Sequence, residues 1–331
     1  MADRGIASTA RASAAPAAHA AAPSKYERLI GEAKRVAVAK AIVVHPCDET
    51  SLRGAIEAAK IGLIIPTLVG PAAKIERAAR EHQIDISAFE VVDAPHSDAA
   101  AAKAVELIRT GQGELLMKGG LHTDELMRAV TSSSTGLRTE RRISHVFVMD
   151  VPSHAETLFI TDAAVNIFPD LDAKRDIVQN AVDLFTAVGL GKPRVAILSA
   201  VETVTSKIPS TIDAAALCKM ADRGQITGAT LDGPLAFDNA VEPEAARIKG
   251  IHSPVAGRAQ ILVVPDLEAG NMLAKNLIYL AKADSAGLVL GARVPIVLTS
   301  RADSVRSRMA SCAVAVLYAA ARRRAATVPA A

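Results

Sequence analysis

The amino-acid sequence predicts an α/β protein with two domains. Short apolar runs alternate with segments of helical periodicity along most of the chain, a pattern typical of βαβ units around a parallel sheet. The chain has 331 residues, and at roughly 150 residues per domain this length suits about two domains. Half of the residues are hydrophobic and 22% are charged, which is typical of a globular chain.

Residues 1–24 differ in composition from the rest of the chain. They are rich in alanine and serine, and they carry Arg4 and Arg11 but only one acid, Asp3. This composition predicts a disordered N-terminal extension, with a transit peptide as the alternative. The segment lacks the continuous apolar region of a secretory signal.

From Lys25 onward the chain is predicted as a regular alternation of helices and strands. Tyr26, Leu29 and Ala33 recur at helical spacing, which indicates an amphipathic first helix. Asp48 is a candidate N-cap for the second helix. The other elements expected in this part are strands at 41–44, 63–69, 89–92 and 115–117 and helices at 72–82 and 98–109.

The alternation continues after residue 140 with longer connections. The expected strands are 146–149, 158–161, 195–198, 261–264, 288–290 and 294–298, and the expected helices are 174–188, 211–223, 268–283 and 304–323. Asp232, Gly233 and Pro234 are predicted as a turn after a short strand, because Asp-Gly-Pro favours a turn. Ligands are expected at the carboxyl ends of the parallel strands.

Charge, cysteine content and hydropathy restrict the class of partner. A net charge of +3 is too weak to indicate a nucleic acid or an anionic membrane, and 3% aromatic residues disfavour base stacking. Cys47, Cys218 and Cys312 are isolated, so neither a zinc site nor a disulfide framework is expected, and the cytoplasm is the predicted location. No apolar stretch reaches the roughly 18 residues of a membrane span. Small anionic molecules are therefore the expected partners.

Four connections carry side chains that suit an anionic ligand. In the first, Ser300 and Arg301 directly follow a predicted buried strand, and Asp303 precedes the last helix. Backbone N–H groups, a hydroxyl and a guanidinium at such a position suit a phosphate or a developing oxyanion. The alternative is structural, with Asp303 or Ser304 as the helix N-cap and Arg301 at the surface.

The other three connections are weaker signals when each is taken alone. Lys118 and His122 flank two glycines that match neither the P-loop nor the dinucleotide fingerprint. Asn271 begins a predicted helix, and Asp232 lies in the predicted turn, so each has an ordinary structural explanation. Lone histidines such as His145 are expected to be structural. Neither HxxxH nor GxSxG occurs, so a metallohydrolase or an α/β-hydrolase is not indicated.

Several segments, in this order along the chain, resemble the phosphate acetyl/butyryltransferase family over roughly residues 26–320. They are residues 116–119, 144–150, 160–166, 209–214, 232–236, 265–271 and 298–304. The resemblance implies a fold of the isocitrate/isopropylmalate dehydrogenase type, with two α/β domains around a cleft. Residues 25–155 and 300–331 would form one domain, and residues 156–299 the other.

The resemblance also implies a reaction and roles for particular residues. Acyl-CoA and inorganic phosphate would be converted to acyl phosphate and free coenzyme A, in either direction, without a metal, a cofactor or a covalent acyl-enzyme. Arg301 would bind the phosphate and the developing oxyanion, and Ser300 would hydrogen-bond near the reacting centre. The candidates for substrate binding are Arg128, Lys118, His122, Asn271 and Asp232.

Two positions depart from the family pattern. Acetyl-type members carry an aspartate, proposed as the base for the coenzyme A thiol, where this chain has Ser307. A second family arginine aligns with Tyr279. The local sequence 299–304 is more similar to the butyryl-type branch. Asp303 is the candidate replacement base, although a thiol of pKa about 8.5 beside arginines needs little help to ionise.

Two alternative functions and the acyl chain length stay open. A hydroxyacid dehydrogenase of the same fold would need metal-binding aspartates and a nicotinamide site, which we do not find in the sequence. A non-catalytic protein that binds coenzyme A or acyl phosphate is the second alternative, motivated by the two departures. The acyl group is expected to be short, acetyl or else propionyl or butyryl. The sequence does not decide between these lengths, because one methylene changes binding by only about 1–3 kcal/mol. The resemblance implies a homo-oligomer, at least a dimer.

Overall fold

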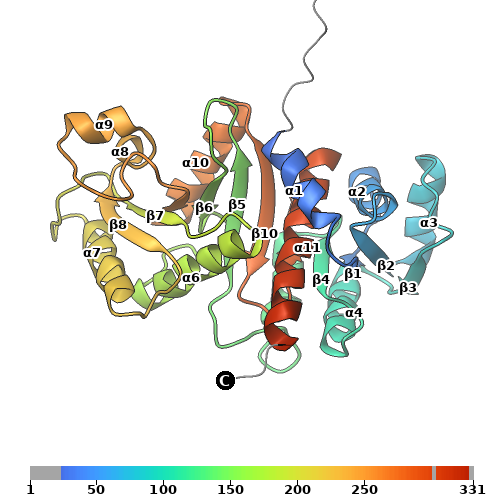
Figure 1. Cartoon of the computed structure of the whole chain (residues 1–331). Coiled ribbons are helices and arrows are strands. Elements are labelled where there is room, and N and C mark those ends of the chain that lie inside the picture. Colours follow the sequence, from blue (N-terminus) through green and yellow to red (C-terminus); the bar gives the residue numbers. More distant parts are fainter. Residues whose placement is uncertain (1–23, 300–302, 328–331) are drawn as a thin grey trace, which may run out of the picture.

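One continuous sheet runs through the molecule (Figure 1). The computed structural model describes residues 24–299 and 303–327. The strands are β1 (Ala39–Val44), β2 (Ile64–Gly70), β3 (Glu90–Asp93), β4 (Leu115–Lys118), β5 (Ser144–Asp150), β6 (Leu158–Thr161), β7 (Arg194–Leu198), β8 (Thr230–Leu235), β9 (Ile261–Val263), β10 (Asp284–Leu290) and β11 (Ile296–Val297). Their spatial order is β3-β2-β1-β4-β11-β10-β5-β6-β9-β7-β8.

Helices connect the strands and confirm most of the predicted order of elements. Two short helices, α8 and α9, were not predicted. The helices are α1 (Lys25–Ala33), α2 (Glu49–Lys60), α3 (Ala72–Glu81), α4 (Ser97–Arg109), α5 (Thr123–Thr131), α6 (Leu171–Ala187), α7 (Pro209–Asp222), α8 (Phe237–Val241), α9 (Pro243–Ile248), α10 (Leu267–Tyr279) and α11 (Val305–Thr327).

The sheet is mixed, and the prediction of a parallel sheet was wrong for its centre. Strands β3, β2, β1, β4 and β11 are parallel to one another, as are β6, β9, β7 and β8. Between these two sets, β10 is antiparallel to β11 and to β5, and β5 is antiparallel to β6. Residues 291–295 are too short for a parallel crossover, which needs a dozen or more residues. The carboxyl ends of the two parallel sets therefore point in opposite directions.

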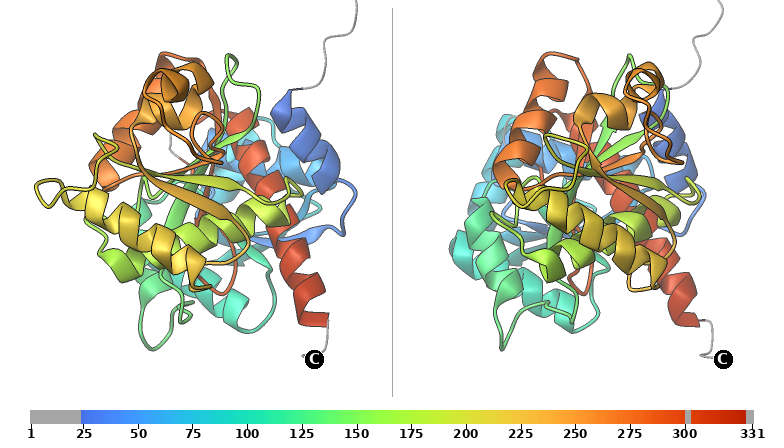
Figure 2. Two further views of the ribbon diagram at one scale, coloured as in Figure 1. Left: turned by 60° about the vertical axis from the view of Figure 1, so that its left-hand side comes forward. Right: turned by 90° about the vertical axis from the view of Figure 1, so that its left-hand side faces the viewer.

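The two faces of the sheet are covered differently. On one face a single hydrophobic core joins α1, α2, α3, α6, α7 and α11 across the sheet. On the other face, α4 and α5 pack over one half, and α8, α9 and α10 pack over the other half as a separate core. Figures 1 and 2 show α1 and α11 side by side on the first face. The molecule is thus continuous on one side and divided on the other.

The predicted division into residues 25–155 with 300–331 and residues 156–299 stays a prediction. Strands β10 and β11 lie in the segment assigned to the second domain. They nevertheless pair with β5 and β4, which were assigned to the first domain. Backbone hydrogen bonds therefore join the two proposed domains at the centre of the sheet.

Residues 230–235 form strand β8, and the predicted turn at Asp232–Pro234 was wrong. Strand β8 lies at the edge of the sheet and pairs only with β7. Proline has no backbone N–H, but at a sheet edge that donor is not needed on the outer side. Local turn preference was therefore overridden by pairing with a strand that lies far back in the sequence.

Helix α1 begins where order was predicted to begin. Ser24 and Glu27 form a capping box, with Ser24 Oγ accepting from the Glu27 N–H at 3.2 Å. The hydroxyl of Tyr26 donates to the Val148 carbonyl at 2.6 Å. Lys25 Nζ lies 2.8 Å from Asp150 Oδ1. These contacts tie α1 to β5, and the rest of the predicted extension, residues 1–23, lies outside the described residues.

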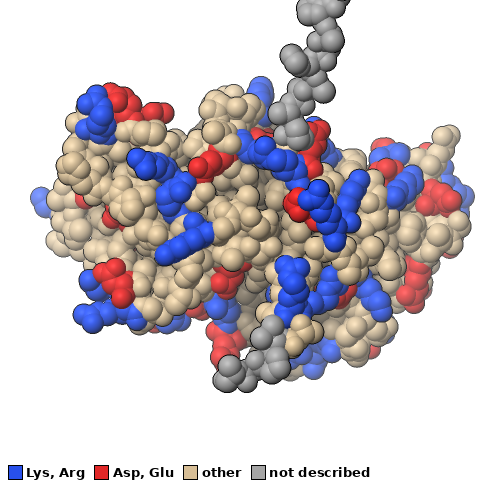
Figure 3. Space-filling model, viewed as in Figure 1, with Lys and Arg blue, Asp and Glu red and all other residues tan. Residues whose placement is uncertain are grey.

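The surface carries both signs of charge without a dominant patch in the view of Figure 3. Basic and acidic side chains are interspersed over that face. In the described part of the chain, no helix is long and apolar enough to cross a membrane.

Candidate active site

The carboxyl ends of β1, β4 and β11 lie side by side. These strands are parallel neighbours, with Val44 of β1 opposite Lys118 of β4 and with β11 paired to the other side of β4. Thr299 follows β11 and is described. The predicted catalytic residues Ser300 and Arg301 come next and lie outside the described residues. The fold therefore brings the residue just before the Ser-Arg pair to the same end of the sheet as Lys118.

Lys118 is buried at the end of β4, with 3% of its surface exposed. Its Nζ donates to the carbonyl of Gly119 at 3.3 Å. A Cβ atom at Gly119 would lie 2.4 Å from the Val44 carbonyl oxygen, and one at Gly120 would lie 2.6 Å from an Asp48 carboxylate oxygen. The glycines thus allow this connection to pack directly on the end of β1, which gives them a structural role.

His122 lies before α5, where its backbone has a defined role. Its N–H donates to Glu125 Oε2 at 2.7 Å, and the Ser97 hydroxyl donates to Glu125 Oε1 at 2.7 Å. These hydrogen bonds, the one from Ser97 foremost, hold the pKa of Glu125 below its usual range. The His122 side chain is exposed beside the Lys118 connection, so ligand binding by its ring stays a prediction.

Arg128 lies farther along α5, and its side chain is 68% exposed. Its guanidinium is 3.4 Å from Asp98 and 3.7 Å from Asp124. Exposed ion pairs of this kind contribute between zero and about 1 kcal/mol. Arg128 can therefore exchange these partners for another anion at little cost in free energy.

Ser304, and not Asp303, caps α11. Ser304 Oγ accepts from the Ser307 N–H at 3.1 Å, which is the hydrogen bond of an N-cap. Ser307 is 8% exposed, and its carbonyl accepts from the Ser311 hydroxyl at 2.8 Å. The position of the family aspartate is therefore occupied by a buried hydroxyl, which cannot act as a carboxylate base.

Arg308 was not predicted as a site residue, although it lies next to the candidates. It is 2% exposed, and its Nη1 donates to Thr299 Oγ1 at 2.7 Å. Burial lowers the pKa of its guanidinium, and the carboxylates of Asp48 and Asp303 raise it. A signal was present in the sequence, because Arg308 lies one helical turn before Cys312 on the apolar face of the predicted helix.

His145 of β5 is buried, which suits the structural role expected of it. It is 1% exposed, and its ring meets that of Phe147 edge-on with centroids 4.4 Å apart. A Cβ atom at Gly287 would lie 3.0 Å from His145 Nε2, so the glycine leaves room for the ring. Burial lowers the pKa of His145 to about 3. The imidazole is therefore neutral at physiological pH.

Asn271 and Asp232 lie in the other half of the sheet. Asn271 Nδ2 donates to the Ala163 carbonyl at 3.2 Å, in the connection after β6. Asp232 Oδ1 accepts from the Gly233 N–H at 2.8 Å, on the edge strand. Because strand direction reverses at the centre of the sheet, the carboxyl end of β9 points away from that of β4. The grouping of these two residues with Lys118 in one site therefore stays a prediction.

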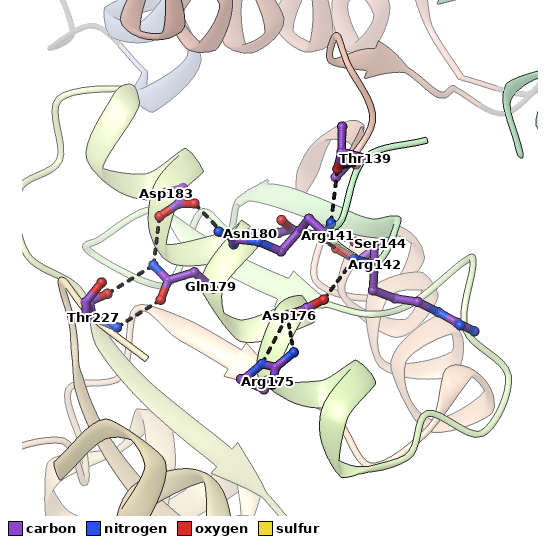
Figure 4. A network of polar contacts seen from close by, with 11 residues as sticks. Thr139, Arg141, Arg142, Ser144, Arg175, Asp176, Gln179, Asn180, Asp183 and Thr227 are labelled. Carbon is purple, nitrogen blue, oxygen red and sulfur yellow. Dashed lines mark hydrogen bonds and ion pairs between the residues drawn. The ribbon is translucent and has the colours of Figure 1, made fainter. Parts of the chain in front are cut away.

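A polar pocket of about 550 Å³ lies at the opposite end of the central strands, between the connection before β5 and α6. Figure 4 shows a network of polar contacts that shares Arg141, Arg142, Arg175 and Asp176 with the lining of this pocket. In it, Arg141 Nη1 is 3.4 Å from Asp183, and the Arg142 N–H donates to Asp176 at 2.9 Å. The charged residues that line the pocket are Arg138, Arg141, Arg142, Arg175, Glu140, Asp170, Asp172 and Asp176. Cations and anions are equal in number among these residues. Among the described residues, no group of three His, Cys, Asp or Glu side chains is placed to hold a metal ion.

Comparison with known proteins matches residues 97–316 to the family model described as Phosphate acetyl/butaryl transferase. A phosphate acetyltransferase of Rhizobium meliloti is 76% identical over 310 residues, which cover 94% of this chain and 98% of that protein. A phosphate butyryltransferase of Clostridium acetobutylicum is 43% identical over 294 residues, covering 89% and 98% of the two chains.

Solved structures agree with the fold. A branched-chain phosphotransacylase from Enterococcus faecalis superimposes with a TM-score of 0.75 at 30% identity, covering 85% of this chain and 99% of that one. A putative 4-hydroxythreonine-4-phosphate dehydrogenase from Salmonella typhimurium has a TM-score of 0.52 at 15% identity, covering 86% of this chain and 100% of that one. The second similarity concerns the fold alone, and it supports the predicted dehydrogenase-like architecture.

Proposed function

Because the chain belongs to the phosphate acetyl/butyryltransferase family, we propose that it transfers a short acyl group reversibly between coenzyme A and inorganic phosphate. The observation that carries this proposal is the identity of 76%, over nearly the whole chain, to a phosphate acetyltransferase. The chain is thus an acyltransferase, and acetyl is the favoured acyl group. The lower identity of 43% to a butyryltransferase makes butyryl the less favoured substrate.

The reaction requires stabilisation of negative charge. A phosphate oxygen attacks the thioester carbonyl, whose oxygen becomes an oxyanion. The C–S bond then breaks, and coenzyme A leaves as a thiolate that takes up a proton. Arg301 binds the phosphate and the oxyanion, and Ser300 donates a hydrogen bond beside the reacting carbon. One preorganised donor of this kind is worth about 3–4 kcal/mol at the transition state.

Lys118, His122 and Arg128 attract the anionic parts of the substrates. Support for this role comes from their place on β4, on α5 and on the connection between them, beside the strand that leads to Arg301. The exposed Arg128 guanidinium has only weak partners to give up. Asn271 and Asp232 have the support of the family pattern alone, since their side chains bond within the other half of the sheet.

In the reverse direction the coenzyme A thiol must lose its proton. Asp303 is the proposed base, because its carboxylate lies two residues after Arg301 in the sequence and because Ser307 has no carboxylate. Arginines near the thiol lower its pKa and so reduce the demand on the base. Neither a metal nor a cofactor is required by this chemistry, and we propose that the enzyme uses none.

The enzyme is proposed to act in the cytoplasm as a homodimer. All three cysteines are free thiols in the structure, which suits a reducing compartment. Helix α10 exposes Met272 and Tyr279, each at 61%, and its C-cap residue Leu280 is 78% exposed. Phe168, which is 76% exposed, follows Ile167, whose carbonyl accepts from the N–H of Leu267 at the start of the same helix. Such an apolar surface is typical of an interface between subunits. Sedimentation equilibrium checks this directly, and a monomer at micromolar concentration would contradict it.

The test of function is phosphate-dependent thiol release. The purified chain is mixed with acetyl-, propionyl- or butyryl-CoA, with and without phosphate, and free coenzyme A is followed with a thiol reagent. Release that requires phosphate and is fastest with acetyl-CoA is expected. Absence of release with every thioester, in a protein that still binds coenzyme A, would favour the non-catalytic alternative.

A further inference from the structure

Arg308 is a buried cation at the start of a helix, a position that ordinarily disfavours positive charge. It is 2% exposed and lies at the N-terminal end of α11. The N-terminal end of a helix carries a partial positive charge, which repels a cation. Burial also removes the water that would solvate the guanidinium. A cation at such a position requires specific partners that offset both effects.

The contacts of Arg308 lie on both sides of the Ser300–Arg301 pair. Its Nη1 donates to Thr299 Oγ1 at 2.7 Å, and Thr299 is itself 3% exposed. Its backbone N–H donates to the Ser304 carbonyl at 3.1 Å, which is the first hydrogen bond within α11 and does not depend on the side chain. The Arg308 side chain therefore joins α11, which begins shortly after the pair, to Thr299 just before the pair.

Neighbouring elements provide the space and the countercharge for this side chain. A Cβ atom at Gly54 of α2 would lie 2.9 Å from Arg308 Cδ, so a larger residue there would displace the side chain. The carboxylates of Asp48 and Asp303 favour the charged guanidinium against the effect of burial. The fold thus accommodates a charged arginine at this point, although an apolar residue would fill the same space without these requirements.

We propose that Arg308 is a positioning residue for acyl transfer, which holds Thr299 against the start of α11 so that Ser300 and Arg301 are correctly placed against the substrates. The inference rests on the proposed function. Arg308 acts through Thr299 and does not itself touch the substrate. If its role were purely structural, Arg308 would only join α11 to α2, and its loss would lower stability without a selective effect on turnover.

The first test separates turnover from substrate binding. Arg308→Met keeps the length of the side chain but removes the charge and the hydrogen bond to Thr299. We expect kcat to fall about 100-fold, because a displacement near 1 Å has an effect of this size. KM for acyl-CoA should stay within about threefold of the wild-type value. Arg308→Lys should recover at least about tenfold of the lost kcat, since a cationic donor is restored.

Matched variants make the outcome decisive. Arg306→Met is the control, because Arg306 lies on the same turn but is 52% exposed, and its kcat should be unchanged. If Arg308→Met does not fold, Thr299→Val removes only the acceptor, and kcat should fall about tenfold. A folded Arg308→Met enzyme with kcat within about threefold of wild type would overturn the proposal. So would a Lys variant no faster than the Met variant, or an unaffected Thr299→Val enzyme.

The second test does not depend on catalysis. Hydrogen–deuterium exchange is measured for a peptide that spans residues 296–306 in the wild type and in Arg308→Met. Exchange should be about tenfold or more faster in the variant, and unchanged exchange would refute the anchoring role. If exchange is faster in Arg308→Met but the wild-type protein shows no phosphate-dependent thiol release, the anchoring role of Arg308 would stand and the proposed function would be rejected.

Discussion

Arginines meet carboxylates at both ends of the central strands, but in different surroundings. Beside the ends of β4 and β11, Arg308 is 2% exposed, and the negative charges of Asp48 and Asp303 raise the pKa of its guanidinium. At the opposite end, the Arg141 side chain is 36% exposed and 3.4 Å from Asp183 (Figure 4). Charges shielded from water interact more strongly than exposed charges, which salt screens. Substitution of a charged residue should therefore change activity or stability strongly at the buried end, beside β4 and β11, and only weakly at the exposed end.

The largest effect is expected at the end that carries the Ser-Arg pair. Arg301→Ala should lower kcat/KM for acyl-CoA roughly 300-fold, because a charge-assisted donor to the oxyanion is lost. The circular dichroism spectrum should not change. Steady-state kinetics check this, and a decrease below about tenfold would remove Arg301 from the catalytic role.

Packing at the same end gives the second prediction. Gly119→Ala should lower the free energy of unfolding by about 2–3 kcal/mol, because its Cβ would lie 2.4 Å from a backbone carbonyl oxygen. Gly31→Ala is the control, since no atom lies within 4 Å of a Cβ there. Alanine in that helix should raise stability by about 0.5–1 kcal/mol. Urea titrations measure the free energy of unfolding of both variants. An equal change in the two variants would contradict the tight packing at Gly119.

Acid should destabilise the protein through the buried centre of the sheet. His145 has a folded pKa of about 3, whereas an unfolded histidine titrates near 6.5, so the unfolded state binds more protons between these values. Its contribution to stability is complete above about pH 6.5 and is lost as the pH falls, by up to about 1.4 kcal/mol per pH unit. Urea midpoints from pH 7.5 to 5 should fall less steeply in His145→Leu. Equal slopes in the two proteins would disprove this contribution.

The smallest effect is expected at the exposed end. Arg141→Ala removes a partly exposed ion pair with Asp183, so the free energy of unfolding should change by less than about 1 kcal/mol. Phosphate-dependent activity should stay at the wild-type level. Thermal melts and thiol-release assays check both statements. A large loss of activity would mean that the polar network in Figure 4 takes part in function after all.

The order of helices and strands could be predicted because it depends on local periodicity and capping. The Asp48 side chain accepts from the Ser51 N–H at 2.9 Å, as its place before the second helix indicated. Local sequence preference gave the wrong structure at Pro234, where pairing of β8 with β7 outweighed the turn preference of Asp-Gly-Pro. It could not find the reversal of strand direction either, since direction depends on which strands become neighbours.

The candidate site was predictable only in part, for a related reason. Residue types that suit an anion mark Arg301 and Lys118, and the resemblance to a family ordered them into one reaction. The partnership of Arg308 with Thr299 was not predictable, because it requires the helix to rotate this side chain toward the end of β11. Residues that suit a substrate can thus be predicted from the sequence more readily than the residues that position them.

The pairing of β10 and β11 with strands from the first half of the chain limits how early the sheet can form during synthesis on the ribosome. Strand β4 completes its pairing only when β11 arrives, and β5 only when β10 arrives. Helix α11, which covers the same strands, is made last. An emerging chain of residues 25–150 therefore exposes unpaired strand edges until the final segment is synthesised. Such edges are prone to aggregation, so the last elements of the sheet also protect those made first.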